Sequence, residues 1–170
     1  MTTAAYYFDA SALVKYYILE PGSTWVRAII NATDAQGTHL MNTIFVADIS
    51  MTEVAAAFAI LHRTQRIRRS ARDGAFGQLV NDATRRYQLL GTDRHDFFAA
   101  ASLTQSHPLK AYDAVQLAVA LRHAANLATY NLPLTFVCGD RTLLAAAQAE
   151  RLLIDNPFDH VAPQDTPARS

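Results

Sequence analysis

The stretch Ala4–Leu19, AAYYFDASALVKYYIL, contains the two kinds of element from which the fold can be predicted. Its first five residues are apolar and rich in aromatic side chains, which is typical of a short buried strand that ends at Asp9. The residues from Ser11 to Leu19 favour a helix, and Pro21-Gly22 stops it. A strand that leads directly into a helix is the building unit of an α/β protein.

The rest of the chain repeats this alternation. Further strands are predicted at Thr43–Ala47, Leu134–Cys138 and Leu152–Asp155, and Tyr87–Gly91 is either a short strand or the end of a helix. Helices are predicted at Thr24–Ala32 with Ser23 as its cap, Ile49–Gln65, from Ser70 through the apolar positions Phe76 to Leu90, Asp93–Ser106, Ala111–Ala125 and Arg141–Arg151. The strands are continuous apolar runs, which indicates a parallel sheet covered by helices on both faces.

Composition limits the class of protein. The chain has 170 residues, of which 51% are hydrophobic, so it can bury a core. Lys+Arg and Asp+Glu are both 15, which excludes a protein that coats nucleic acid by bulk charge alone. The single cysteine, Cys138, excludes an internal disulfide framework and a zinc site built from several cysteines.

We expect one domain over residues 1–160, followed by a flexible tail over residues 161–170 that contains Pro163 and Pro167. The longest apolar run, Val54–Leu61, is too short to span a bilayer. Asp9 interrupts the first apolar stretch, so no secretory signal is visible. We therefore expect a cytoplasmic protein without a membrane partner.

Four acids are placed by this topology at one edge of the sheet. Asp9 follows the first strand, and Asp140 follows the Leu134–Cys138 strand by one glycine. Glu53 and Asp113 lie near the starts of two helices. Ligands bind at the carboxyl edge of such a sheet, where these acids should meet. Mg²⁺ prefers carboxylate oxygens and water, and one or two such ions would give a hydrolytic site for phosphodiesters.

Each acid also has a simpler interpretation. Asp9 and Asp140 could serve only as caps of the helices that follow them. Glu53 could be only the capping-box partner of Ser50, and Asp48 could cap the same helix. Asp113 could only favour the dipole of its helix.

Five motifs follow one another along the chain: Tyr7–Lys15 (YFDASALVK), Glu53-Val54 within Ile49–Phe58, Ala111–Ala118 (AYDAVQLA), Phe136–Leu144 (FVCGDRTLL) and Asp155-Asn156-Pro157. In this order, from about Ala5 to Pro157, they resemble the motifs of PIN-domain ribonucleases. Two positions depart from the pattern. Gln116 stands where many relatives have histidine, and Cys138-Gly139 replaces a commoner pair of small hydroxyl residues.

The resemblance implies a three-layer α/β/α sandwich and cleavage of RNA that depends on Mg²⁺ or Mn²⁺. It implies that Asp9, Glu53, Asp113 and Asp140 bind the metal, and that Ser11 helps to order the site. Bacterial members of this size are mostly VapC-type toxins of toxin–antitoxin pairs, which a small antitoxin protein neutralises. The resemblance also implies a homodimer.

A basic segment follows Glu53 along the chain. No acid occurs between Val54 and Arg72, but five arginines do: Arg63, Arg66, Arg68, Arg69 and Arg72. If metal neutralises the four site acids, the rest of the chain has four more basic than acidic residues. These arginines, with Lys15, are candidates for contacts with RNA phosphates. The alternative is a solvated helix end, and for Lys15 an ordinary surface lysine.

Two other functions remain open from the residues. An aspartyl-phosphate phosphatase would use Asp9 as its nucleophile, but Ser11 occupies the place of the second aspartate of such enzymes. A non-catalytic PIN-fold protein would use the basic segment to bind RNA or a protein partner. The four acids argue against this, because a cluster of carboxylates without a function only costs stability.

Overall fold

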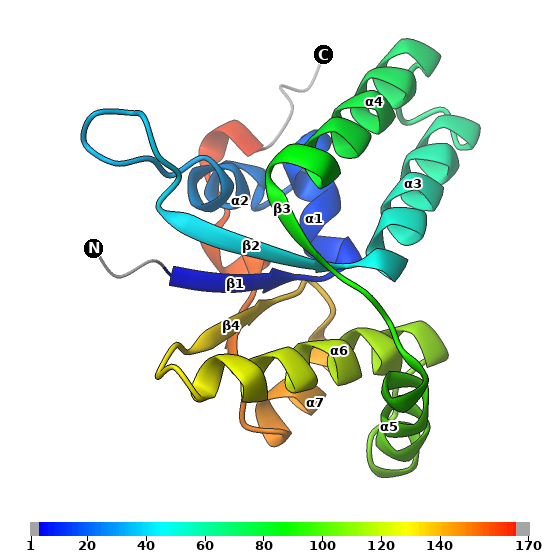
Figure 1. The fold of residues 1–170 in the computed structure, drawn as a ribbon. Coiled ribbons are helices and arrows are strands. Elements are labelled where there is room, and N and C mark those ends of the chain that lie inside the picture. The colour runs from blue at the N-terminus through cyan, green and yellow to red at the C-terminus, as the bar shows by residue number, and fades with distance from the viewer. Residues whose placement is uncertain (1–3, 166–170) are drawn as a thin grey trace.

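The computed structural model describes residues 4–165, and its centre is a parallel sheet of five strands (Figure 1). The order across the sheet is β3-β2-β1-β4-β5. The strands are β1 (Ala4–Phe8), β2 (Asn42–Ala47), β3 (Tyr87–Leu90), β4 (Leu134–Val137) and β5 (Leu153–Asp155). Each neighbouring pair is parallel. The predicted parallel sheet is therefore confirmed, and the segment Tyr87–Gly91 contains a strand, β3, rather than the end of a helix.

Helices cover both faces of the sheet, which confirms the three-layer α/β/α sandwich (Figure 1). On one face lie α1 (Ala10–Tyr17), α2 (Ser23–Ile30), α3 (Asp48–Arg63) and α4 (Arg69–Arg85). On the other lie α5 (Arg94–Ser106), α6 (Ala111–Ala128) and α7 (Arg141–Ala149). Two short 3₁₀ helices follow, η1 (Pro157–His160) and η2 (Pro163–Asp165). No helix within residues 4–165 is long and apolar enough to span a bilayer.

Alternate residues of the central strands enter two separate cores. Tyr7 of β1 packs in the core beneath α6, while its neighbour Phe8 packs in the core beneath α1 and α3. Both side chains are fully buried. The Tyr7 ring stacks on Phe136 of β4 with 5.3 Å between ring centroids. Because both faces are buried, the strands read as unbroken apolar runs in the sequence.

Two predicted helix caps are wrong. Gly22, not Ser23, is the N-cap of α2, and its φ of 89° suits glycine. The Ser23 hydroxyl instead accepts from the Glu20 N–H and donates to the Ile18 carbonyl within the turn. The capping box of Ser50 is absent, because α3 begins at Asp48 and its N-cap, Ala47, has no side-chain cap. Ser50 is fully buried inside the first turn of α3.

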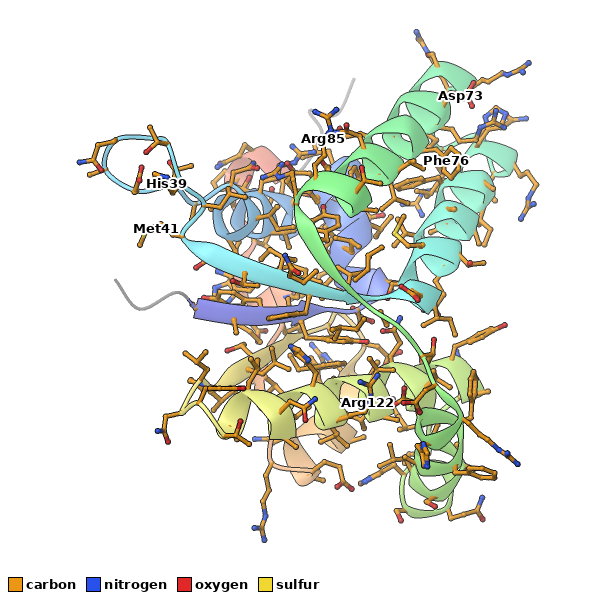
Figure 2. All side chains as sticks on the ribbon, viewed as in Figure 1. His39, Met41, Asp73, Phe76, Arg85 and Arg122 are labelled. Atoms are coloured by element: carbon orange, nitrogen blue, oxygen red, sulfur yellow. The ribbon has the colours of Figure 1, made fainter. Side chains whose placement is uncertain are left out.

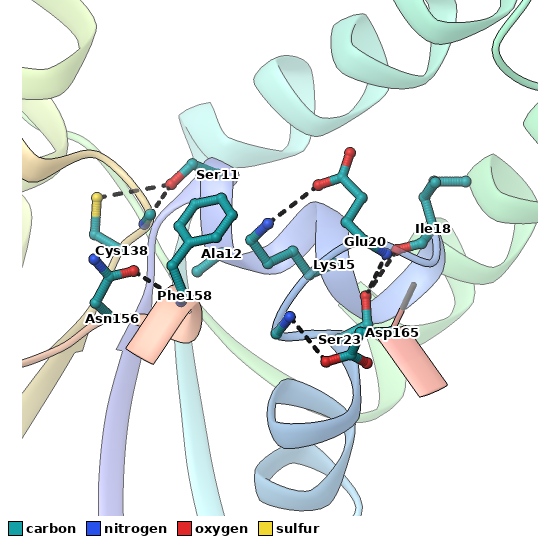
Figure 3. A network of polar contacts seen from close by, with 12 residues as sticks. Ser11, Ala12, Lys15, Ile18, Glu20, Ser23, Cys138, Asn156, Phe158 and Asp165 are labelled. Carbon is teal, nitrogen blue, oxygen red and sulfur yellow. Dashed lines mark hydrogen bonds and ion pairs between the residues drawn. The ribbon is translucent and has the colours of Figure 1, made fainter. Parts of the chain in front are cut away.

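Residues 161–165, the first part of the expected flexible tail, include a 3₁₀ helix whose last residue packs against the start of α2. Asp165 in η2 is fully buried. Its carboxylate accepts hydrogen bonds from the Gly22 and Thr24 N–H groups, at 3.0 and 2.9 Å, and thus caps α2 from the far end of the chain. Figure 3 shows this carboxylate beside Ser23. Residues 166–170 lie outside the described part of the chain.

Candidate functional site

Asp9 is buried at the carboxyl end of β1, where the chain turns into α1. It is 5% exposed, and its Oδ1 accepts the Ala12 N–H at 2.9 Å as the cap of the helix. The Ser11 hydroxyl donates to both oxygens of the carboxylate, at 2.8 and 3.0 Å. Asp9 therefore has the capping role considered above, and Ser11 contacts its carboxylate.

Burial raises the pKa of Asp9 from 3.8 to about 6. Hydrogen bonds from Ala12, Ser11 and Cys138 act in the opposite direction but do not cancel the desolvation. The carboxylate is thus held in a site that disfavours its charge. A cation at this place would remove the penalty.

Ser11 and Cys138, which a dashed line joins in Figure 3, link Asp9 to the start of α7. The Gly139 N–H donates to Ser11 Oγ at 2.8 Å, while the Cys138 thiol donates to Asp9 Oδ2 at 3.3 Å. The Asp140 N–H in turn donates to Cys138 Sγ at 3.2 Å. The unusual Cys138-Gly139 pair therefore joins the ends of β1 and β4.

Glu53 lies in α3 and is held by Gln116 of α6. The Gln116 Nε2 donates to Glu53 Oε2 at 2.6 Å and to Ser50 Oγ at 2.6 Å. Desolvation raises the pKa of Glu53, the Gln116 hydrogen bond lowers it, and the charge of Asp113 raises it. Glu53 is therefore tied to α6 rather than to a capping box.

Asp113 and Asp140 come from the first turn of α6 and from the N-cap of α7. Desolvation raises the pKa of Asp113, and the nearby charge of Asp140 raises it further. Asp140 Oδ1 accepts the Thr142 and Leu143 N–H groups, at 2.7 and 3.0 Å, so the residue does cap its helix. Its second oxygen accepts no hydrogen bond from the described residues.

The four acids lie at the carboxyl edge of the sheet, but they do not form a complete set of metal ligands. Repulsion acts between Glu53 and Asp113 and between Asp113 and Asp140. Within residues 4–165, no three Asp, Glu, His or Cys side chains are close enough to share a metal ion. The expected tight cluster of four is therefore not present.

The donor set nevertheless fits a divalent cation. Mg²⁺ keeps several waters and is bound by one or two carboxylates, so it does not require a complete protein cage. None of the four acids forms a salt bridge with a lysine or arginine among the described residues. The charge of Lys110 lowers the pKa of Asp113 but does not cancel the effects of desolvation and of Asp140. Carboxylates that repel one another and form no salt bridge are suited to a hard cation.

The basic segment lies apart from the acids, at the outer end of the α3–α4 hairpin (Figure 1). Ten residues of helix separate Glu53 from Arg63, a distance of about 15 Å along the axis. Asp73, at the tip of α4 in Figure 2, pairs with Arg69 and Arg72. Arg63, Arg66 and Arg68 are exposed and form no ion pair within residues 4–165.

Lys15 is not a surface lysine. It is 2% exposed, and its Nζ lies 3.2 Å from Glu20 Oε2 and 4.0 Å from the centroid of the Phe158 ring (Figure 3). Its charge is thus already neutralised and covered by η1. The placement gives no support to a phosphate contact by Lys15.

Comparison with known families agrees with this geometry. The model of the PIN domain family matches residues 6–134, a range that contains Asp9, Glu53 and Asp113. The chain belongs to the PIN domain family. The predicted membership is thereby confirmed. No curated protein matches the sequence at a significant level.

Solved structures share the PIN fold at low sequence identity. PAE2754 of Pyrobaculum aerophilum has a TM-score of 0.56 and 17% identity, over 92% of this chain and 85% of that one. VapBC2 of Rickettsia felis, bound to a DNA fragment from its promoter, has a TM-score of 0.54 and 13% identity, over 89% and 98% of the two chains. A toxin–antitoxin complex of Klebsiella pneumoniae has a TM-score of 0.50 and 16% identity, over 91% and 98%.

Sequence reasoning missed the residues that hold Glu53. Gln116 was recognised only as a departure from the PIN pattern, and Ser50 was assigned to a cap. The available signal was the placement of a polar residue inside the most apolar helix, where a buried amide requires partners. The identity of those partners depends on contacts between residues far apart in sequence, such as the 63 positions between Glu53 and Gln116.

Proposed function

We propose that this PIN domain is a metal-dependent endoribonuclease that hydrolyses RNA phosphodiester bonds. The observation that carries the proposal is the set of carboxylates at the sheet edge, Asp9, Glu53, Asp113 and Asp140, which lack basic partners within residues 4–165. Membership of the PIN family supports a nuclease, and four carboxylates without a salt bridge to lysine or arginine support a divalent cation, Mg²⁺ or Mn²⁺.

We assign a role to each of the four acids and to Ser11. Asp113 with Glu53 or Asp140 would hold an ion at the open rim, since these side chains are only partly buried. Asp9 would supply a deeper oxygen, and Ser11 keeps that carboxylate in place. The ion would activate a water and offset charge on the attacked phosphate. Asp140 keeps one oxygen fixed by the α7 N-terminus and the other available.

The biological setting is also a proposal. The VapBC2 and Klebsiella structures are toxin–antitoxin assemblies, which supports a toxin role and a small antitoxin partner for this chain. We place the activity in the cytoplasm, where RNA substrates are present, and we expect the chain to form a homodimer. Sedimentation of the purified protein, alone and with the product of a neighbouring small gene, tests both partner expectations.

We expect the purified chain to cleave RNA with Mg²⁺ or Mn²⁺ and to stop when EDTA is added. The Asp113→Asn variant should lose at least about a thousandfold in rate, since a metal contributes several kcal/mol to stabilising the transition state. The matched control is Asp159→Asn, which removes an exposed acid outside the site. Gel analysis of end-labelled RNA measures both. Equal activity of Asp113→Asn and the wild type would contradict the proposal.

A non-catalytic RNA-binding function is the second candidate. It is favoured by the absence of a three-residue metal group within residues 4–165. It requires that RNA binding persist in EDTA and that no divalent ion produce cleavage. The same gel assay, combined with a filter-binding assay, separates it from the nuclease.

The exposed arginines at the α3–α4 tip make a separate prediction. Replacing Arg66 and Arg68 by alanine should weaken RNA binding, because both lack an ion pair among the described residues. Two lost phosphate contacts should reduce the slope of log affinity against log salt by about 1.4 on single-stranded RNA. The matched control replaces the exposed Arg85 and Arg94. If the slope of log affinity against log salt is unchanged, Arg66 and Arg68 do not contact RNA phosphates.

A further inference from the structure

Gln116 connects three elements behind the rim of acids. It lies in α6, is 2% exposed, and reaches β1 and α3 at once. The Tyr7 hydroxyl of β1 donates to its Oε1 at 2.6 Å. Its Nε2 donates to Ser50 Oγ and to Glu53 Oε2 of α3, both at 2.6 Å. Every strong polar atom of the amide therefore has a partner.

The orientation of the amide is determined by Tyr7. The Tyr7 hydroxyl is fully buried and acts as the donor in its hydrogen bond to Gln116. A donor must face the amide oxygen rather than the NH₂ group. The NH₂ group is consequently directed at α3, where one N–H reaches Ser50 and the other reaches Glu53.

Asp113 lies one turn before Gln116 on the same face of α6. The hydrogen bond from Gln116 thus fixes the Glu53 carboxylate relative to the helix that carries Asp113. A free glutamate side chain has several rotamers, and selecting one costs entropy each time a ligand binds. Because Tyr7 holds the Gln116 amide and the amide holds Glu53, the Glu53 rotamer is already selected before a ligand binds, so this entropy is not lost on binding.

We infer that Gln116 is a positioning residue, which holds the Glu53 carboxylate ready to bind a divalent cation together with Asp113. The inference rests on the proposed function for the presence of a metal, and it adds the residue that orders one of its ligands. Groups that orient metal ligands from outside the coordination sphere commonly contribute 10–100-fold in metal affinity.

The test measures Mn²⁺ binding directly, by calorimetry and by the electron paramagnetic resonance of free Mn²⁺, without RNA. Gln116→Met keeps the length of the side chain but removes both N–H donors, and should weaken Mn²⁺ binding by about 10–100-fold. Gln116→His at pH 8 keeps one N–H donor and should recover most of that loss. Tyr7→Phe leaves Gln116 in place, removes the group that orients it, and should weaken Mn²⁺ binding several-fold.

Tyr17→Phe is the matched control. Its hydroxyl also lies in a partly buried network, with Tyr87 and Asp82, on the opposite side of the sheet from Gln116. We expect this variant to lose stability in urea without a change in Mn²⁺ affinity. A purely structural role of Gln116 would give the same result for Gln116→Met as for Tyr17→Phe.

The outcomes separate this inference from the nuclease proposal. Wild-type affinity in Gln116→Met, or equal weakness of the Met and His variants with Tyr7→Phe unaffected, would overturn the positioning role while leaving RNA cleavage possible. Gln116-dependent Mn²⁺ binding without RNA cleavage would support the positioning role and reject the nuclease. A wild-type protein that binds no Mn²⁺ would overturn the inference, whatever its activity on RNA.

Discussion

Replacing Asp9 by asparagine is expected to abolish RNA cleavage and, at the same time, to stabilise the metal-free protein. Asparagine keeps an oxygen for the Ala12 N–H, so the cap of α1 survives. It removes a buried negative charge that has no lysine or arginine partner among the described residues. The same charge that would hold the cation is thus a cost to folding when the cation is absent.

The direction of the pH dependence follows from the raised pKa of Asp9. Its value is about 6 in the folded protein against 3.8 for the ordinary side chain, so the folded state binds the proton more tightly. Stability from this group is therefore full at low pH and falls as the pH rises from about 4 to about 6. A difference of about 2 units corresponds to roughly 3 kcal/mol, and we expect Asp9→Asn to gain about 1–3 kcal/mol at pH 7.

Urea unfolding in EDTA at pH 4.5 and pH 7.5 measures this effect. The wild type should lose stability relative to Asp9→Asn between the two values, while Asp159→Asn should follow the wild type. In Mn²⁺ the order should reverse, because only the wild type gains binding free energy from the ion. If Asp9→Asn is less stable than the wild type in EDTA at pH 7.5, the carboxylate has a structural role larger than its desolvation cost.

The sheet and its edge could be predicted because the information is local. The strands are short apolar runs, and Asp9 and Asp140 are placed by the ends of β1 and β4. Parallel pairing then brings them to one side without knowledge of any contact. The family motifs carry the same information.

Contacts between distant residues could not be predicted in this way. Ser50 has the spacing of a capping box with Glu53, but α3 begins at Asp48 and both side chains bind Gln116. Gly22 rather than Ser23 is the N-cap of α2, and the acceptor for the first N–H groups of the helix comes from Asp165, more than 140 positions away. A sequence pattern over a few residues does not identify partners that lie so far away along the chain.

Replacing Asp165 by alanine is expected to destabilise the protein strongly, although the residue lies at the end of the described chain. Its carboxylate accepts from four groups: the N–H groups of Gly22, Thr24 and Ala162 and the hydroxyl of Thr24. Alanine would leave these donors without an acceptor at a fully buried position. Each unsatisfied buried donor costs about 1–3 kcal/mol, but the segment can partly rearrange, so we expect a loss of about 2–4 kcal/mol.

Lowering the pH should remove the stability that the Asp165 carboxylate contributes. Burial acts to raise the pKa of Asp165, but the hydrogen bonds from Ala162, Thr24 and Gly22 outweigh it and hold the pKa at about 2. A lowered pKa stabilises the fold above the ordinary value near 4 and loses that effect as the pH falls toward 2. The gap in urea stability between wild type and Asp165→Ala should therefore be full at pH 7 and narrow at pH 2–3.

Asp165→Asn separates the hydrogen bonds from the charge. It keeps one acceptor oxygen, so it should lose less stability than Asp165→Ala at pH 7, while Asp159→Asn should stay within about 0.5 kcal/mol of the wild type. Equal stability of Asp165→Ala and wild type would show that the last turn does not hold α2. If Asp165→Ala does lose stability, we expect the effect to reach the site. In the sequence, η1 lies between the end of β5 and Asp165, and it places Phe158 over Lys15 and Gly139. The C-terminal segment would then be part of what keeps Ser11 and Asp9 in place.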